Sequence, residues 1–137
     1  MANTTPQLQA SLMVALGGGV GALARYQLGR AMTAWMGPQM MTFFPWATLA
    51  ANTLGSIAMG LLAGWLVKSA PENAEQLRLL LGVGLLGGFT TFSAFSLELA
   101  MLVQRGQVLV AGTYIMLSIG LGVSGFLFGL FMTRLLA

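Results

Sequence analysis

Residues 77–103 read LRLLLGVGLLGGFTTFSAFSLELAMLV. The stretch is apolar, and a helix needs about 20 residues to cross a hydrocarbon core about 30 Å thick. A straight helix of this length would run roughly 40 Å, which overshoots that core. At its centre lies GGFTTFS, residues 87–93, where two glycines disfavour helix and hydroxyl groups can bond the freed backbone. The sequence predicts a membrane helix broken at mid-depth, and such a break indicates an ion or substrate site.

Three further segments are long and apolar enough to cross a bilayer: residues 8–32, 46–67 and 108–135. Helix breakers separate them, including Gly37-Pro38 and Pro71. The N-terminus lacks the basic region and the cleavage site of a secretory signal, so we expect the first helix to stay. We therefore expect residues 1–137 to form one all-α integral membrane domain with spans at about 8–32, 46–67, 77–103 and 108–135.

The composition favours lipid over water as the main solvent. The chain is 57% hydrophobic and 7% charged, whereas about a quarter of the residues of a soluble domain are charged. Its six basic residues are scattered, so no patch for nucleic acid is expected. The lack of cysteine and histidine excludes thiolate or imidazole metal sites and Ser/His or Cys/His nucleophiles, so we do not expect an enzyme.

Glycine spacing predicts where the helices touch. The chain contains 19 glycines, and small residues let membrane helices approach closely. The GxxxG pairs are Gly17/Gly21, Gly60/Gly64 and Gly125/Gly129. Residues 52, 56, 60 and 64 form one stripe at helical spacing, which places the amide of Asn52 on a small-residue face.

The basic residues give no orienting signal. With four spans, Lys68, Arg78 and Arg134 lie on one side of the membrane, and Arg25, Arg30 and Arg105 lie on the other. This balance predicts that the chain inserts in both orientations and pairs as an antiparallel, dual-topology homodimer.

Polar groups inside spans normally face the protein interior or a pathway. Tyr114 and Ser118 lie on one face of the fourth span, although the serine could bond its own helix and the tyrosine could lie at the membrane interface. Glu98 is the one acidic residue placed well within a span, and it is either a proton-coupled carboxylate or a hydrogen-bonded structural group.

Phe92 and Phe95 lie three residues apart after the expected break, so their rings share a helix face. Such a pair usually packs against lipid or core. A phenyl ring also has a positive edge, which can receive an anion without holding it tightly.

Three motifs resemble those of the Fluc fluoride channels, also called CrcB. They are GGVGALARY at residues 18–26, ANTLGS at 51–56 and GGFTTFSAFS at 87–96. The resemblance covers essentially the whole chain, and the third motif is the most specific.

The resemblance implies an antiparallel homodimer in the bacterial inner membrane, with two pores that export fluoride passively and a central structural sodium ion. The carbonyls of Gly87 and Thr90 would hold the sodium, Asn52 would donate to fluoride, and the edges of Phe92 and Phe95 would face the ion. The remaining expected pathway residues are Thr91, Ser93, Ser96, Glu98, Tyr114 and Ser118, with Arg25 in a vestibule.

This sequence departs from the family at Ala94, where many members carry threonine, so no hydroxyl is expected there. Bare fluoride would cost tens of kcal/mol to move into a low dielectric, so replacement donors are needed. An amide, hydroxyls and ring edges supply them, and we expect no buried basic residue at mid-depth that would trap the ion.

Three alternatives remain open. A small multidrug transporter is also a four-helix dual-topology dimer, but it needs a carboxylate in its first helix, and none is present in residues 8–32. A fluoride/proton antiporter would use Glu98 to carry the proton. A membrane scaffold held by the GxxxG contacts would carry no ion.

Overall fold

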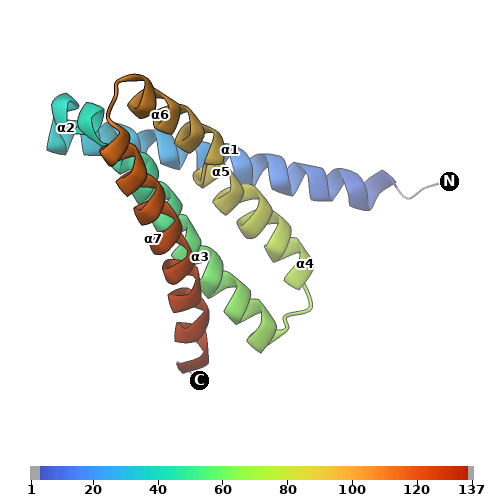
Figure 1. Ribbon diagram of the computed structural model, residues 1–137. Helices are drawn as coiled ribbons and strands as arrows, with labels where there is room; N and C mark the ends of the chain where they lie inside the picture. The colour runs from blue at the N-terminus through green and yellow to red at the C-terminus, as the bar shows by residue number, and fades with distance from the viewer. Residues whose placement is uncertain (1–3, 136–137) are drawn as a thin grey trace.

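The computed structural model describes residues 4–135, and this part of the chain is helical with no strand (Figure 1). Three of the spans are dominated by single helices: α1 (Thr4–Met36), α3 (Trp46–Ser69) and α7 (Val108–Leu135). The third span consists of α4 (Ala74–Leu77), the π-helical segment η1 (Arg78–Leu86), α5 (Gly87–Phe89) and α6 (Phe92–Gln104). Four helical stretches of the described chain are long and apolar enough to span a membrane, which confirms the predicted all-α membrane architecture.

A short helix that the sequence analysis did not predict, α2 (Pro38–Phe43), lies in the first connection. Gly37 precedes it with φ of 85°, a left-handed conformation that glycine adopts without strain. Pro38 occupies the first turn, where its missing N–H costs no helical hydrogen bond. Pro45 then caps α3, so the breakers in this connection reverse the chain through an additional turn of helix.

The segment η1 was also not predicted. Its bonds follow the wider i→i+5 pattern, and the N–H of Gly87 still reaches the carbonyl of Gly82. Gly82 and Gly84 are buried in this segment, and a Cβ on Gly84 would come within 3.0 Å of the Cα of Gly17. The wider helix therefore lies where α1 packs closely against the third span.

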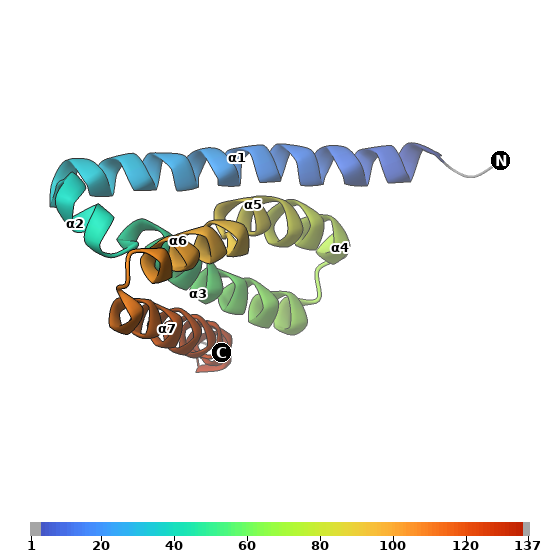
Figure 2. The same cartoon turned by 45° about the horizontal axis from the view of Figure 1, so that its top comes forward.

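The spans pack as two tight pairs, α1 with η1 and α5, and α3 with α7. In Figure 2, α1 and α7 lie on opposite sides of the molecule, with α3 and the third span between them. A Cβ on Gly21 would meet backbone atoms of Leu85 and Phe89, and one on Gly129 would meet backbone atoms of Ile57 and Leu61. The glycine pairs therefore lie at helix contacts, as their spacing predicted.

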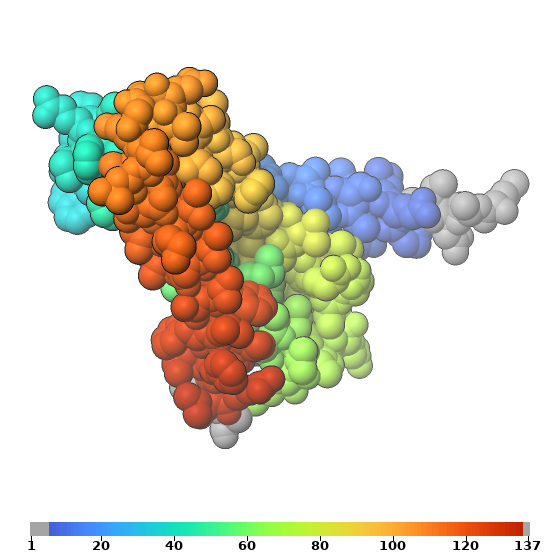
Figure 3. Space-filling model, in the orientation of Figure 1, coloured from blue at the N-terminus to red at the C-terminus, as the bar shows by residue number. Residues whose placement is uncertain are grey.

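The buried core is small and lies at the end of the molecule where α2 is found. Its members pack around one fully buried side chain, and they are Phe44, Leu49, Leu102, Ala111 and Tyr114. Most other large apolar side chains are exposed, and the space-filling view shows the N-terminal part of α1 projecting beyond the other helices (Figure 3). This surface suits lipid or another membrane helix, because neither excludes apolar groups.

Candidate functional site

The third span is interrupted at Thr90 and Thr91. Their backbones are extended, with φ and ψ of −85° and 158° for Thr90 and of −153° and 121° for Thr91. The predicted break is confirmed, but it is narrower than expected, because Gly87, Gly88 and Ser93 are helical. Gly88 serves packing instead, since a Cβ there would collide with backbone atoms of Gly18 on α1.

Asn52 on α3 holds the broken backbone with two hydrogen bonds. The N–H of Thr91 donates to Oδ1 of Asn52 at 2.7 Å, and Nδ2 of Asn52 donates to the carbonyl of Thr91 at 3.0 Å. An amide nitrogen carries two N–H bonds, so one donor of Asn52 remains for another acceptor. The polar side chain predicted for the small-residue face of α3 therefore meets the break directly.

The break frees backbone carbonyls of the turn that precedes it, and those of Gly87 and Thr90 are among them. In a continuous helix the N–H of Thr91 would bond the carbonyl of Gly87, and the N–H of Ala94 would bond that of Thr90. Here the N–H of Thr91 goes to Asn52, and the N–H of Ala94 donates to Oγ1 of Thr91 at 3.1 Å. The carbonyls of Gly87 and Thr90 lose these partners, and carbonyl oxygens are ligands that hard cations accept.

The hydroxyl groups near the break divide into two kinds. Oγ1 of Thr91 and Oγ of Ser93 lie 3.3 Å apart, so these hydroxyls form one polar pair. Thr90 instead donates to the carbonyl of Leu86 at 2.9 Å, and Ser96 donates to the carbonyl of Phe92 at 3.0 Å. Ser96 thus bonds its own helix, which is the plainer of the two interpretations of serines within spans.

A cavity of about 290 Å³ adjoins the break in the third span, and residues of α3 and α7 form the rest of its wall. Its wall combines an amide, hydroxyls and aromatic rings, and its lining includes Asn52, Ser56, Thr90, Thr91, Phe92 and Phe126. A site that offers N–H and O–H donors beside ring edges suits a small anion, which accepts hydrogen bonds.

Phe92 and Phe95 lie next to each other, with ring centroids 5.6 Å apart and planes inclined by 36°. The side chain of Phe92 is 79% exposed. Phe95 is half-buried, and its ring lies 5.0 Å from that of Tyr114. The two rings therefore form a continuous aromatic path from an exposed position at the break toward the buried core.

Glu98 lies at the inner end of this path and accepts two short hydrogen bonds. The hydroxyl of Thr48 donates to Oε1 at 2.7 Å, and that of Tyr114 donates to Oε2 at 2.7 Å. The sequence analysis missed Thr48, although it lies four residues before Asn52 and so extends the polar stripe of α3 by one turn. Both oxygens of the carboxylate are thereby fixed by neighbouring helices.

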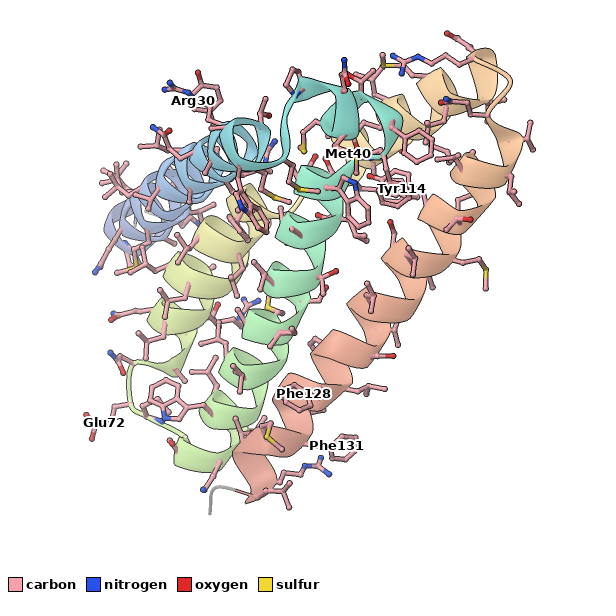
Figure 4. All side chains as sticks on the ribbon, turned by 90° about the vertical axis from the view of Figure 1, so that its left-hand side faces the viewer. Arg30, Met40, Glu72, Tyr114, Phe128 and Phe131 are labelled. Atoms are coloured by element: carbon pink, nitrogen blue, oxygen red, sulfur yellow. The ribbon has the colours of Figure 1, made fainter. Side chains whose placement is uncertain are left out.

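Tyr114 is fully buried and points inward from α7 toward α3 (Figure 4). Its hydroxyl bonds Glu98, so it does not occupy an interfacial position facing lipid. The hydroxyl oxygen of Ser118, one turn further along α7, is buried, and no hydrogen-bond partner lies within reach in the part of the chain that the structure describes. A buried hydroxyl without a partner is costly, which favours a ligand or water beside it.

Arg25 borders a cavity of about 690 Å³, together with Arg30, Thr48, Ala94 and Glu98. Its Nε donates to the carbonyl of Gly88 at 3.3 Å. The charge of this half-buried side chain therefore lies near the middle of the third span. The long arginine side chain spans the distance from α1, which residue position alone does not reveal.

Comparison with known proteins identifies the family. The family model described as "CrcB-like protein, Camphor Resistance (CrcB)" matches residues 12–130. A protein of Erythrobacter litoralis named fluoride-specific ion channel FluC is 57% identical over 98% of this chain and 99% of its own length. A protein of Novosphingobium aromaticivorans with the same name is 53% identical over 93% of this chain and 98% of its own.

A third relative, from Rhodospirillum centenum and also named fluoride-specific ion channel FluC, is 49% identical over 90% of this chain and 94% of its own length. The family match spans most of the chain, and these relatives are similar over nearly their full lengths. This chain therefore belongs to the CrcB family.

Proposed function

We propose that this protein is a passive, fluoride-selective ion channel that exports fluoride across the bacterial inner membrane. The name of its relatives supports this function. The observation that carries the proposal is the pair of hydrogen bonds between Asn52 and Thr91. They hold the broken backbone beside an amide donor, hydroxyls and phenyl rings at one cavity. Conduction involves no chemical step, so we assign no catalytic residue.

The proposed path replaces the water around fluoride with weak donors in series. Fluoride is strongly hydrated, and its transfer without partners into a low dielectric would cost tens of kcal/mol. The remaining N–H of Asn52 and the hydroxyls of Thr91 and Ser93 act at the break. The edges of Phe92 and Phe95 follow, and Tyr114 with Ser118 continues the polar side of the path. Each donor is weak enough to release the ion, as conduction requires.

The same break suits a structural sodium ion. The carbonyls of Gly87 and Thr90 lack their usual helical donors, and the described residues contain no cluster of three acidic, histidine or cysteine side chains that could hold a metal. These carbonyls, from two copies of the chain, would therefore be the ligands. A sodium ion bound there supplies positive potential beside the path of an anion.

A second copy of the chain explains the exposure of polar groups around the break. Gly87, Ser93 and Ser96 are exposed, although they lie in the middle of a membrane span. Polar groups at such depth are normally covered by protein or line a wet cavity. We therefore infer a homodimer in which the two breaks face each other and each copy contributes to two pores.

The antiparallel arrangement of this dimer follows from the even distribution of basic residues. The substitutions Asn73→Lys and Gln76→Lys would add positive charge near the second connection and fix one orientation of the chain in the membrane. Fluoride transport by this variant alone should fall, and co-expression with a variant biased the opposite way should restore it. Undiminished transport by the fixed variant alone would exclude antiparallel pairing.

A proton-coupled fluoride antiporter is the main competing function, because Glu98 is a carboxylate within a span. Its oxygens are both occupied by the hydroxyls of Thr48 and Tyr114, which favours a positioning role. A multidrug transporter of the four-helix type is disfavoured by the absence of a carboxylate in α1.

Growth on fluoride tests the proposed function in cells. Expression of this chain in a bacterium that lacks its own fluoride exporter should restore growth in fluoride medium. Expression of an equal amount of the Asn52→Asp variant should not. Failure of the unmodified chain, at normal abundance in the membrane, would overturn the proposal.

A further inference from the structure

A third and smaller cavity, of about 200 Å³, lies between α2 and α6. It adjoins the cavity of about 690 Å³ that Arg25 borders, which we call the vestibule. Two side chains line both cavities, Met41 of α2 and Glu98 of α6. These two side chains therefore belong to the partition between the two cavities. Methionine is unbranched and adapts its shape easily, so this partition can yield to a small ion.

Arg105 lies at the edge of the smaller cavity, just after the end of α6. Its Nη1 donates to the carbonyl of Thr42 at 3.2 Å, which holds the guanidinium beside α2. A guanidinium has five N–H bonds, so this contact leaves others for an anion. The residue is exposed, and water can bring an ion to it.

The charges around Glu98 are arranged on both sides of it. Arg25 and Arg30 border the vestibule, and Arg105 borders the smaller cavity. The carboxylate itself accepts hydrogen bonds from Thr48 and Tyr114. An anion on either side of the partition thus meets a cation as well as the carboxylate.

Arg105 also differs from the arginine at the opposite end of the third span. Arg78 forms a salt bridge with Glu75 at 2.7 Å, and this is the single salt bridge between side chains of the described residues. Arg105 forms no such salt bridge within the described residues, and the carboxylate that lines its cavity is that of Glu98. A cation beside a cavity with low-dielectric walls raises the local concentration of anions.

We propose that the smaller cavity is a second mouth of the anion pathway and that Arg105 draws fluoride into it. The inference rests on the proposed function, because it names the residue that guides the transported ion. Its physical basis is the positive charge of Arg105, and the Thr42 contact only positions that charge.

Chemical modification of a cysteine at position 105, which changes the charge there, tests this inference. The chain contains no cysteine, so Arg105→Cys introduces a single reactive thiol. Fluoride flux would be measured in liposomes before and after reaction with two methanethiosulfonates of similar size, one carrying trimethylammonium and one carrying sulfonate. Arg134→Cys, at the end of α7 and away from both cavities, is the matched control.

We expect Arg105→Cys to lower fluoride flux several-fold at low ionic strength and less at high ionic strength, because salt screens exposed charges. The cationic reagent should restore flux, and the anionic reagent should lower it further. Equal effects of the two reagents, or none, would overturn the proposal. The second measurement uses the unmodified chain. Its fluoride flux should fall when inert salt is added, and a flux that does not change with salt would also contradict the role of Arg105. Absence of any fluoride flux from the unmodified chain would instead refute the proposed function.

Discussion

Asn52 bonds both backbone groups of Thr91, accepting from its N–H at 2.7 Å and donating to its carbonyl at 3.0 Å. The two residues are 39 positions apart, so a side chain of α3 gives the N–H of Thr91 a partner in place of the Gly87 carbonyl. Without that replacement, the extended backbone would leave polar groups unpaired within a membrane span, at a cost of several kcal/mol. The conformation of the break therefore depends on one amide.

Asn52→Asp should abolish fluoride flux. An ionised carboxylate cannot donate to the Thr91 carbonyl and would repel both this oxygen and an approaching anion. Flux from liposomes containing purified protein provides the measurement, with Asn73→Asp in the exposed second connection as the matched control. Near-normal flux through a folded Asn52→Asp protein would remove Asn52 from the pathway.

Phe92→Ile and Phe95→Ile should each reduce fluoride flux, because isoleucine keeps an apolar side chain but lacks the positive ring edge. Phe92 is 79% exposed, so its substitution should leave thermal stability unchanged. Phe95→Ile also removes a ring contact with Tyr114 and should cost about 1 kcal/mol of stability. Phe128→Ile on the exposed face of α7 is the control. Unaltered fluoride flux in both the Phe92 and the Phe95 variant would show that these rings only pack against their neighbours.

Gly21→Ala should destabilise the protein, whereas Gly19→Ala should not. A Cβ on Gly21 would lie 2.8 Å from the backbone N of Phe89 and still closer to the Leu85 carbonyl, while a Cβ on Gly19 meets no atom within 4 Å. Overpacking of this kind costs about 1–3 kcal/mol. Thermal unfolding in detergent measures the difference, and equal midpoints for the two variants would show that α1 does not pack closely on the third span.

Tyr114→Phe should lower stability by about 1–3 kcal/mol, because Oε2 of Glu98 would lose its donor in a half-buried site. The ring contacts of Tyr114 with Phe44 and Phe95 remain available to phenylalanine, so the effect reports the hydroxyl. Tyr26→Phe, at an exposed position, should change the unfolding midpoint little. If Tyr114→Phe also left the unfolding midpoint unchanged, the hydrogen bond to Glu98 would not contribute to the stability of the fold.

The sequence predicted the spans, the break and the glycine contacts because each depends on local pattern or on residue size. Apolar length identified the four spans, and the spacing of Gly21 and Gly129 identified contacts that the structure contains. The π-helical η1 could not be predicted in this way, because it arises where the backbones of α1 and the third span approach each other. Gly87 and Gly88 were expected to lie in the break, but both remain helical, and Gly88 packs against α1.

The sequence predicted which residue types form the site, but it predicted less well which residues hydrogen-bond to one another. Asn52 was singled out as an amide on a small-residue face, but its partner Thr91 lies on another helix. Thr48 escaped notice because a threonine hydroxyl within a span usually bonds its own helix, whereas here it reaches Glu98. Arg25 was placed in a vestibule, and its length carries it further, to the carbonyl of Gly88.

Ion release from liposomes tests passive, selective fluoride conduction most directly. Purified protein would be reconstituted in liposomes loaded with potassium fluoride, and efflux would be followed with a fluoride electrode after addition of valinomycin. Chloride-loaded liposomes and protein-free liposomes are the controls. We predict rapid fluoride release that does not depend on a pH gradient, with no release of chloride. Release that follows the proton gradient would contradict a passive channel and indicate an antiporter centred on Glu98, and no release from folded protein would contradict transport altogether.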